Sequence, residues 1–450
     1  MKTPRDTSEI TLVGAGLAGS LLAVFLARRG HRVALLERRP DPRIAGAAGG
    51  RSINLALANR GIAALEEVGA MDTVRSALIP MVGRMLHDEE GRLKLIPYGN
   101  KPHEVIYSVS RGGLNELLLD AAERTGKVSI RFGETVGGVD FGNRRVLPQG
   151  TPYDVLIGTD GSASPVRGAI LERTGGWLDE APLGHGYKEL TIPAGTAGVG
   201  GGFRMEKNAL HIWPRGEYML IALPNADGSF TATLFLPQTG EESFEVLTTP
   251  DAVRALFERR FADAIPLMPR LVEDFFGNPT GHLETIRCAP WSFEDHALVL
   301  GDAAHAIVPF HGQGMNAAFE DCSAFDRCLA DPDRPWSEVF AEFESRRRPN
   351  TDAIADMALE NYVEMRSTVR EPKFQLKKEL SFRLEERHPD RFIPRYSMVM
   401  FHTLPYAEAQ RRGAIQEGIL DELTSGAASA DEVDFERADR LIEERLGTAP

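Results

Sequence analysis

Unbroken apolar runs mark the first part of the chain. Residues 9–13 (EITLV) and 32–37 (RVALLE) predict buried strands, and residues 17–29 between them predict a helix. The connections are short, so these elements predict a β–α–β unit with parallel strands. The same pattern predicts further strands at 129–132, 154–158 and 297–301, an extended arm at 51–58, and helices at 60–69, at 114–124 and from about residue 313.

A different pattern occupies residues 185–237. Apolar and polar residues alternate there between turn residues, which is typical of an antiparallel sheet with one packed face. After Pro335 the chain is mostly helical and rich in charge. We therefore expect an α/β chain (α+β overall) with a discontinuous Rossmann-like domain, an inserted antiparallel-sheet domain and a helical C-terminal region. Their expected ranges are 1–75, 100–180 and 285–340 for the first, 76–99 and 181–284 for the second, and 341–450 for the third.

Three glycines follow the first strand in the spacing GxGxxG. Gly14 allows a tight turn, Gly16 lets a pyrophosphate approach the backbone, and Gly19 lets helix and strand pack closely. The helix that starts at Leu17 offers free N–H groups to phosphates. Glu37 ends the second strand, where an acidic side chain binds ribose hydroxyls. The next residue, Arg38, either flanks an adenine or is a solvated surface charge.

Two later strands end in a glycine and a short acid. Asp160 precedes Gly161 after the strand at 154–158, and Asp302 follows Gly301 after the strand at 297–301. Ligands bind at the carboxyl ends of strands in open α/β sheets. Each pair also fits an ordinary turn with an aspartate cap.

Composition argues against several classes of function and site. The net charge of −14, from 65 acidic and 51 basic residues, disfavours nucleic-acid binding. Three cysteines without a Cys-x-x-Cys pair disfavour a zinc site or a disulfide framework and fit a reducing cytoplasm. The apolar run at 11–27 follows Asp6 and Glu9 and contains three glycines, so we interpret it as core and not as a signal peptide. We expect no metal, no membrane anchor and a cytoplasmic protein.

In this order, the GxGxxG, DG and GD motifs resemble the class A flavoprotein aromatic hydroxylases, which share the para-hydroxybenzoate hydroxylase fold. GRSINLALANRG (50–61), YSVSRGGLNELLL (107–119) and PFHGQGMNAAFEDC (309–322) are similar to the branch that hydroxylates L-kynurenine in tryptophan catabolism and pyridine nucleotide biosynthesis. The resemblance implies bound FAD, transient NADPH and a flavin C4a-hydroperoxide formed with O₂. The chain ends in ERADRLIEERLGTAP where eukaryotic members carry a membrane anchor, and LALANRG lacks an expected serine.

The resemblance also implies roles for individual residues. Arg84 and Tyr98 would hold the substrate carboxylate, and Asn361 and Tyr396 would add polar contacts. Phe235, Pro309, Phe310, His311 and Met365 would surround the aromatic ring, and no residue is assigned proton chemistry. The implied FAD contacts are Gly14, Gly16, Leu17, Gly19, Glu37, Arg38, Arg111, Val136, Asp160, Asp302, Gly314, Met315 and Asn316.

Residue patterns alone leave other interpretations open. Arg84 could form a surface ion pair, Tyr98 could belong to a turn, and His311 could be a core residue. The substrate could be a related aromatic amino acid or an anthranilate-like ring. A flavoprotein reductase or a non-catalytic flavin-binding partner would share the fold, and a homodimer is possible.

Overall fold

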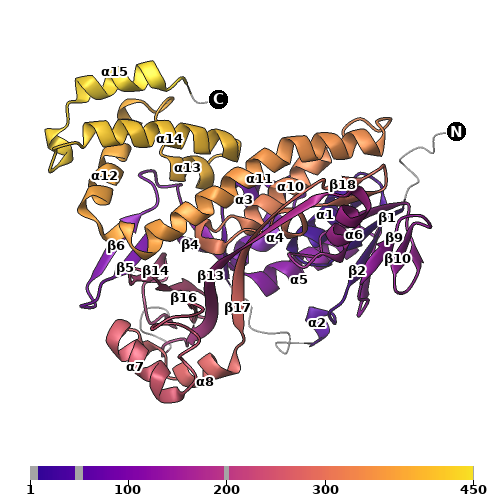
Figure 1. The fold of residues 1–450 in the computed structure, drawn as a ribbon, viewed down its shortest axis with the longest axis horizontal. Coiled ribbons are helices and arrows are strands. Elements are labelled where there is room, and N and C mark those ends of the chain that lie inside the picture. The colour runs from indigo at the N-terminus through magenta and orange to yellow at the C-terminus, as the bar shows by residue number, and fades with distance from the viewer. Residues whose placement is uncertain (1–8, 46–53, 197–201, 449–450) are drawn as a thin grey trace. The chain divides into compact units, whose positions relative to one another are not determined.

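The structure, a computed structural model, describes residues 9–45, 54–196 and 202–448 (Figure 1). The chain divides into two compact units, each made of three segments. Unit 1 comprises Met1–Leu78, Val109–Pro182 and Glu284–Ala355, and unit 2 comprises Ile79–Ser108, Leu183–Leu283 and Asp356–Pro450. The C-terminal helices from residue 356 thus fall within unit 2, where the sequence analysis counted a separate region. Residues 50–53 of the first family-like motif lie outside the described ranges.

A six-stranded sheet organises unit 1. Its order is β18-β19-β12-β1-β2-β8, and every pairing is parallel except β18 with β19. The predicted β–α–β unit is confirmed as β1, α1 and β2. The strands are β1 (Glu9–Val13), β2 (Arg32–Glu37), β8 (Val128–Phe132), β12 (Val155–Gly158), β18 (Ser292–Phe293) and β19 (Ala297–Val299).

Helix α1 (Leu17–Arg28) explains the long apolar run near the N-terminus. Every residue from Gly19 to Ala27 is buried, because α1 packs on β1 and β2 and also on α5 (Arg111–Arg124) and α10 (Gly314–Cys328). A helix covered on nearly all sides has no polar face to expose, so its sequence is apolar throughout. Among the described residues, no helix has the length and apolar composition needed to cross a bilayer.

A seven-stranded sheet organises unit 2, with the order β17-β13-β16-β15-β14-β5-β6. The alternation in the sequence is confirmed in β13, where buried and partly exposed positions alternate from Gly186 to Ile192. One face packs on α7 (Pro250–Arg260) and α8 (Leu271–Gly277) through a core that includes Trp213, Phe230 and Phe257. The strands are β5 (Gly83–His87), β6 (Leu93–Pro97), β13 (Trp177–Ile192), β14 (Ala209–Pro214), β15 (Met219–Pro224), β16 (Phe230–Pro237) and β17 (Thr280–Ala289).

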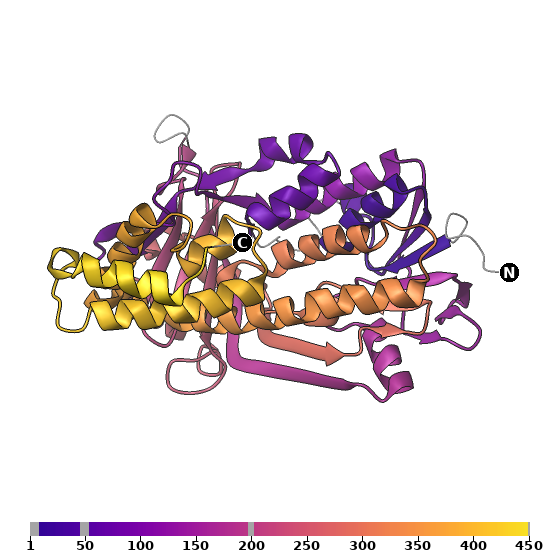
Figure 2. The same cartoon turned by 90° about the horizontal axis from the view of Figure 1, so that it is seen from above.

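The last part of the chain is helical, as predicted. Helices α12 (Pro372–Arg387), α14 (Tyr406–Leu423) and α15 (Phe435–Arg445) share an apolar core, and the two last helices lie side by side, in yellow, in Figure 2. The remaining elements are α2 (Pro42–Ala45), α3 (Asn59–Glu67), α4 (Met71–Val74), α6 (Pro165–Thr174), α9 (Asp302–His305), α11 (Trp336–Arg366), α13 (Arg395–Met400), β3 (Asn54–Leu57), β4 (Ile79–Met81), β7 (Ile106–Ser110), β9 (Gly138–Asp140), β10 (Arg145–Leu147), β11 (Thr151–Pro152), and the 3₁₀ turns η3 (Arg75–Ala77), η5 (Ile265–Leu267), η6 (Pro309–His311), η7 (Thr368–Arg370) and η8 (Ala430–Glu432).

One buried side chain ties β3 to the start of α10. Asn316 Oδ1 accepts the Ala58 N–H at 2.9 Å, and its Nδ2 donates to the Ala56 and Gly312 carbonyls at 2.8 Å each. A Cβ on Gly61 would lie 2.6 Å from Asn316 Oδ1, so this position has room only for glycine. The pairing explains why the LALANRG and GMNAAF motifs occur together in one chain.

Replacing Asn316 by alanine should lower the free energy of unfolding by about 1–3 kcal/mol, because the buried Ala58 N–H loses its acceptor. Urea denaturation measures this. Ser345→Ala is the control, since that exposed hydroxyl donates to the Glu342 carbonyl of its own helix, and a change within about 0.5 kcal/mol is expected. Equal losses in the two variants would contradict this role of Asn316.

Candidate functional site

The carboxyl edge of the six-stranded sheet gathers the predicted cofactor residues. β19, β12 and β1 are adjacent and parallel, so Asp302, Asp160 and Gly14, which follow them, lie at one edge. Glu37 ends the neighbouring β2 at the same edge. Ligands of open α/β sheets bind at such an edge.

The three glycines of the GxGxxG motif meet different demands. Gly14 has φ +99°, and a Cβ there would lie 2.6 Å from the Thr159 carbonyl oxygen. A Cβ on Gly19 would lie 2.0 Å from the Gly14 carbonyl oxygen. A Cβ on Gly16 would meet no heavy atom within 4 Å. The fold therefore requires Gly14 and Gly19, whereas Gly16 leaves space in front of the α1 N-terminus. This space fits the pyrophosphate of FAD.

Glu37 is buried and held by its neighbours. Its carboxylate accepts the Ala15 N–H at 2.9 Å and the Arg39 N–H and Nε–H, also at 2.9 Å. Burial opposes ionisation, but the hydrogen bonds from Arg39 and Ala15 outweigh it and hold the Glu37 pKa below its ordinary value. The exposed Arg38 was predicted to contact the cofactor, whereas the role of Arg39 was not predicted. Arg39 lies two residues after Glu37, and that spacing was the sequence signal for their contact.

Two other residues predicted to contact FAD, Val136 and Arg111, lie in the segment after β8 and at the start of α5. Val136 is partly buried in the segment after β8, where the Gly133 and Glu134 N–H groups donate to the Arg39 and Glu37 carbonyls. Exposed Arg111 opens α5, and one turn later Asn115 Nδ2 donates to the Ala15 carbonyl at 3.1 Å. The sequence analysis did not single out Asn115, which fastens α5 to the glycine loop. The contacts of Val136 and Arg111 with FAD stay predictions.

The two aspartates at the edge differ in orientation. Asp302 is exposed, and Gly301 before it has φ +63°. Asp160 faces inward: its Oδ2 accepts the Val166 N–H in α6 at 3.4 Å, and burial raises its pKa to about 6. Asp302 is therefore placed to meet a ligand, whereas Asp160 lies behind the edge surface.

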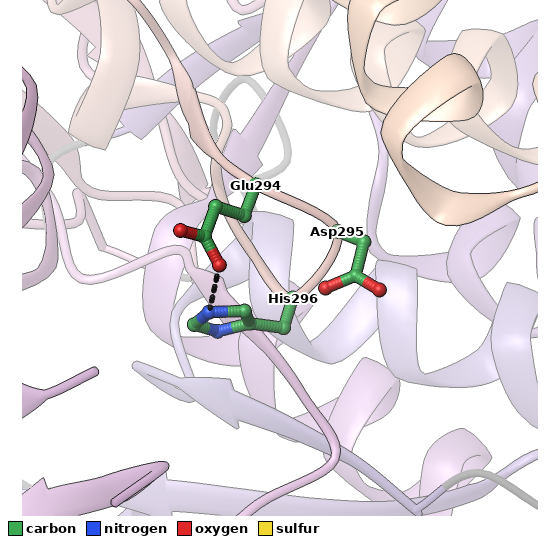
Figure 3. A group of neighbouring side chains, drawn as sticks. All are labelled: Glu294, Asp295 and His296. Atoms are coloured by element: carbon green, nitrogen blue, oxygen red, sulfur yellow. Dashed lines mark ion pairs between the residues drawn. The ribbon is translucent and has the colours of Figure 1, made fainter. Parts of the chain in front are cut away.

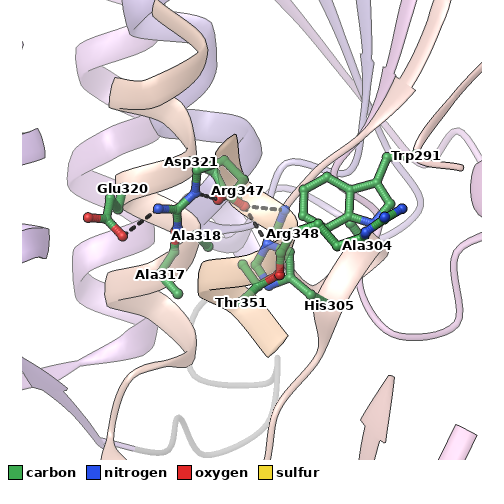
Figure 4. A network of polar contacts seen from close by, with 12 residues as sticks. Trp291, Ala304, His305, Ala317, Ala318, Glu320, Asp321, Arg347, Arg348 and Thr351 are labelled. Atoms are coloured by element: carbon green, nitrogen blue, oxygen red, sulfur yellow. Dashed lines mark hydrogen bonds and ion pairs between the residues drawn. The ribbon is translucent and has the colours of Figure 1, made fainter. Parts of the chain in front are cut away.

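A buried polar network supports the Gly301 turn from behind (Figure 4). Asp321 of α10 accepts the Gly301 N–H at 2.9 Å and His305 Nε2 at 2.5 Å. Arg347 of α11 donates to Asp321 at 2.6 Å and to Glu320 at 2.6 Å. Burial opposes ionisation of Asp321, but the charges of His305 and Arg347 hold its pKa below its ordinary value. Sequence analysis missed Asp321 and Arg347.

The start of α10 offers backbone donors. The first N–H that donates along the helix is that of Ala317, to the Gln313 carbonyl at 2.8 Å. The N–H groups of Gly314, Met315 and Asn316 belong to the unpaired first turn of a helix. Asn316 was predicted to lie beside the flavin; its side chain is engaged by β3, so the backbone is what it can offer.

The Pro309–His311 turn, η6, precedes this helix. Pro309 is exposed, whereas Phe310 and His311 are buried. Of the three residues of this turn, all predicted to surround the ring, Pro309 presents the most surface.

Unit 2 contains a buried guanidinium site. Arg84 on β5 donates from Nη1 to Glu364 at 2.7 Å and from Nη2 to Asn361 Oδ1 at 3.3 Å, both on α11. Its Nε has no hydrogen-bond partner among the described residues. A guanidinium carries N–H donors on all three nitrogens, so the Nε–H is available to a ligand. The Glu364 charge raises the Arg84 pKa despite burial, and Arg84 in turn holds the Glu364 pKa below its ordinary value, so both stay charged.

Two tyrosines complete the guanidinium site. The rings of Tyr98 and Tyr396 stack with centroids 5.5 Å apart and planes 8° apart. The Arg84 guanidinium carbon lies 5.0 Å from the Tyr396 ring and 5.9 Å from the Tyr98 ring. Burial raises the Tyr396 pKa to about 12 and the Tyr98 pKa well above its ordinary value, so both hydroxyls remain donors.

The structure thus brings four of the predicted substrate residues together: Arg84, Tyr98, Asn361 and Tyr396. Met365 is buried beside them, with Asn361 Nδ2 3.4 Å from its sulfur. Phe235 is buried in β16. Glu364 was missed, although its position three residues after Asn361 puts both on one face of a helix.

Glu294, Asp295 and His296 form a group that could hold a cation (Figure 3). Asp295 pairs with Arg144 at 3.1 Å, and His296 Nδ1 lies 3.3 Å from the Tyr153 hydroxyl. These partners account for the group without an ion.

Gly16→Val should leave the protein folded but abolish FAD binding, because the new side chain fills the space before α1. Gly19→Val should prevent folding, because its Cβ overlaps the Gly14 carbonyl. Thermal unfolding and the visible absorbance of the purified proteins measure the two effects. FAD bound normally to a folded Gly16→Val protein would contradict the placement of the pyrophosphate.

Comparisons with known proteins agree with this geometry. The family model described as an FAD binding domain matches residues 7–176 and 217–358. The chain also resembles the solved 2-methyl-3-hydroxypyridine-5-carboxylic acid oxygenase, with TM-score 0.65 and 21% identity over 81% of this chain and 94% of that one. CtdE, solved in complex with FAD and a substrate, matches with TM-score 0.66 and 18% identity over 93% of this chain and 100% of that one. The two solved structures confirm the fold, and the family model confirms the FAD prediction.

Relatives at higher identity place the chain more narrowly. Kynurenine 3-monooxygenase of Myxococcus xanthus is 51% identical over 98% of this chain and 96% of that protein. The enzyme of the same name from Stenotrophomonas maltophilia is 47% identical over 97% of each. These matches, with the family model, show that the chain belongs to the kynurenine 3-monooxygenase family of FAD-dependent aromatic hydroxylases.

Proposed function

We propose that the protein is an FAD-dependent, NADPH-consuming monooxygenase that converts L-kynurenine and O₂ to 3-hydroxy-L-kynurenine. The observation that carries the proposal is the buried guanidinium site on β5 and α11, in a chain of this family. Arg84 keeps its Nε–H for a carboxylate, and Tyr98 and Tyr396 add hydroxyl donors beside it.

The same site suits the amino group of the substrate. Glu364 is an ionised carboxylate adjacent to Arg84, so an α-amino acid can place its carboxylate on Arg84 and its ammonium near Glu364. L-Kynurenine carries both groups at its aliphatic end and an aniline at the other. Holding the aliphatic end fixes which ring carbon is presented for reaction.

FAD, once reduced by NADPH, supplies the activation of O₂. The chain contributes binding and electrostatics. Gly16 and the start of α1 would hold the pyrophosphate, Asp302 would hold hydroxyls of the ribityl chain, and the first N–H groups of α10 would stabilise negative charge on the flavin ring. The aniline nitrogen already activates the substrate ring, so the reaction needs no strong base.

NADPH and the cellular setting complete the proposal. The sequence contains a single GxGxxG motif, so we infer that NADPH binds only transiently.

The three buried, free cysteines fit a cytoplasmic enzyme. A homodimer fits as well, and the mass of the protein in solution tests it.

The purified protein should oxidise NADPH faster when L-kynurenine is added, and the product should be heavier by one oxygen atom. Absorbance and mass spectrometry measure the two. A related aromatic amino acid that turns over in its place would favour the alternative substrate. NADPH oxidation without any oxygenated product would favour a reductase.

Arg84→Lys should raise the KM for L-kynurenine by about tenfold or more while FAD stays bound, because an ammonium keeps the charge beside Glu364 but loses the planar fork. Arg84→Ala should raise it further, and should also destabilise the protein by about 1–3 kcal/mol because the partly buried Glu364 loses its partner. Steady-state kinetics and urea denaturation separate the two effects. An unchanged KM in both variants would show that Arg84 does not hold the carboxylate.

A further inference from the structure

A lysine with no assigned role lies beside the guanidinium site. Lys378, on α12, makes no side-chain hydrogen bond or ion pair among the described residues, and its Nζ lies 5.7 Å from the centroid of the Phe382 ring. Burial, together with the charge of Arg84, lowers its pKa to about 8, and the charge of Glu364 acts in the opposite direction. The side chain is only partly exposed, and its ammonium group is open to an anionic ligand.

The contacts of α12 show independently which way Lys378 faces. Gln375 accepts a hydrogen bond from Lys94 on β6 at 2.5 Å, and Glu385 accepts one from Lys101 at 2.6 Å. The spacing of positions 375, 378, 382 and 385 puts them on one helix face. Lys378 lies between the two fastened ends, so it faces the β5–β6 hairpin. In that hairpin the backbone of Arg84 on β5 lies opposite that of Ile96 on β6.

The guanidinium site has no net positive charge to balance a bound carboxylate, so a second cation would stabilise that carboxylate. Arg84 and Glu364 form a pair of zero net charge, so an added carboxylate would bring an uncompensated negative charge into a buried place. A protonated Lys378 cancels that charge. Other carboxylates around α12 are engaged elsewhere: Glu417 and Asp421 of α14 by Lys377, Asp431 of η8 by Arg383, and Glu385 by Lys101.

We propose that Lys378 is a second cation of the substrate-carboxylate site, so that the carboxylate binds between the Lys378 ammonium and the Arg84 guanidinium. This inference rests on the proposed function, because it assumes a substrate carboxylate at Arg84. It makes substrate binding depend on the protonation of one lysine, and therefore on pH.

Lys378 is the group of the site that titrates near neutral pH. Its pKa is about 8, whereas Tyr396 titrates at about 12 and Tyr98 well above its ordinary value. Glu364 stays ionised and Arg84 stays charged throughout. Arg395, the other cation that acts on Glu364, is paired with Glu360 at 2.6 Å. A carboxylate should therefore bind well below about pH 8 and more weakly above it, as Lys378 loses its proton.

The test uses the FAD-loaded protein and 4-(2-aminophenyl)-4-oxobutanoate, the deamino analogue of L-kynurenine. The analogue lacks the α-ammonium, which would itself titrate in this range. Its Kd, measured from the change in flavin absorbance, should rise about tenfold or more between about pH 7 and about pH 9.5 in the wild-type protein. Lys378→Met should show a weakened, pH-independent Kd, and Lys378→Arg a tight Kd that no longer rises with pH.

Lys377→Met is the matched control, because the neighbouring lysine pairs with Glu417 and Asp421 of α14. It should bind the analogue as the wild type does, with the same pH dependence. A Lys378→Met protein with wild-type Kd at both pH values would overturn the proposal. If that protein and the wild type both hydroxylate L-kynurenine, the failure concerns Lys378 alone; a wild type that makes no hydroxylated product would instead overturn the proposed function.

Discussion

The buried charge of Arg84 is the constraint on which the substrate side depends. A guanidinium withdrawn from water must be compensated, and Glu364 compensates it at 2.7 Å while two tyrosine rings cover it. Among the described residues Nη1 bonds to Glu364 and Nη2 to Asn361, whereas Nε has no partner, so the charge is fixed in place and keeps a donor for a ligand. Arg84 lies on the β5–β6 hairpin and its partners lie on α11, so the site requires that these two parts of unit 2 pack together.

The FAD side depends on a different constraint, which is the parallel order of β19, β12 and β1. That order brings Gly14 and Asp302 to one edge although 287 positions separate them in the chain. Each strand end is then stabilised from behind. Asn115 holds the first glycine loop, and Asp321 with Arg347 holds the Gly301 turn. The ligand-facing groups are few, and most of the polar residues nearby keep those few in place.

Much of this arrangement could be predicted from the sequence, for a physical reason. Glycine spacing and strand-end acids are local signals, because each follows from a turn between two neighbouring elements. The unbroken apolar run of α1 and the alternation in β13 likewise report burial directly. For Arg39 and Glu364 the only signal was their spacing from a predicted residue, and for Asp321 we identified none. A charged residue in a polar stretch is ordinarily solvated, and their importance comes from partners or neighbours that only the fold supplies. Likewise, the sequence did not show that the Asn316 side chain is engaged by β3, which leaves its backbone for the predicted contact with the flavin.

The account makes one central claim, that this chain transfers an oxygen atom from O₂ to the ring of L-kynurenine. The most direct measurement is turnover of L-kynurenine with NADPH under isotopically labelled O₂, followed by the mass of the product. The account predicts 3-hydroxy-L-kynurenine that carries one labelled oxygen atom. An unlabelled product, or consumption of O₂ to peroxide with L-kynurenine recovered unchanged, would contradict it.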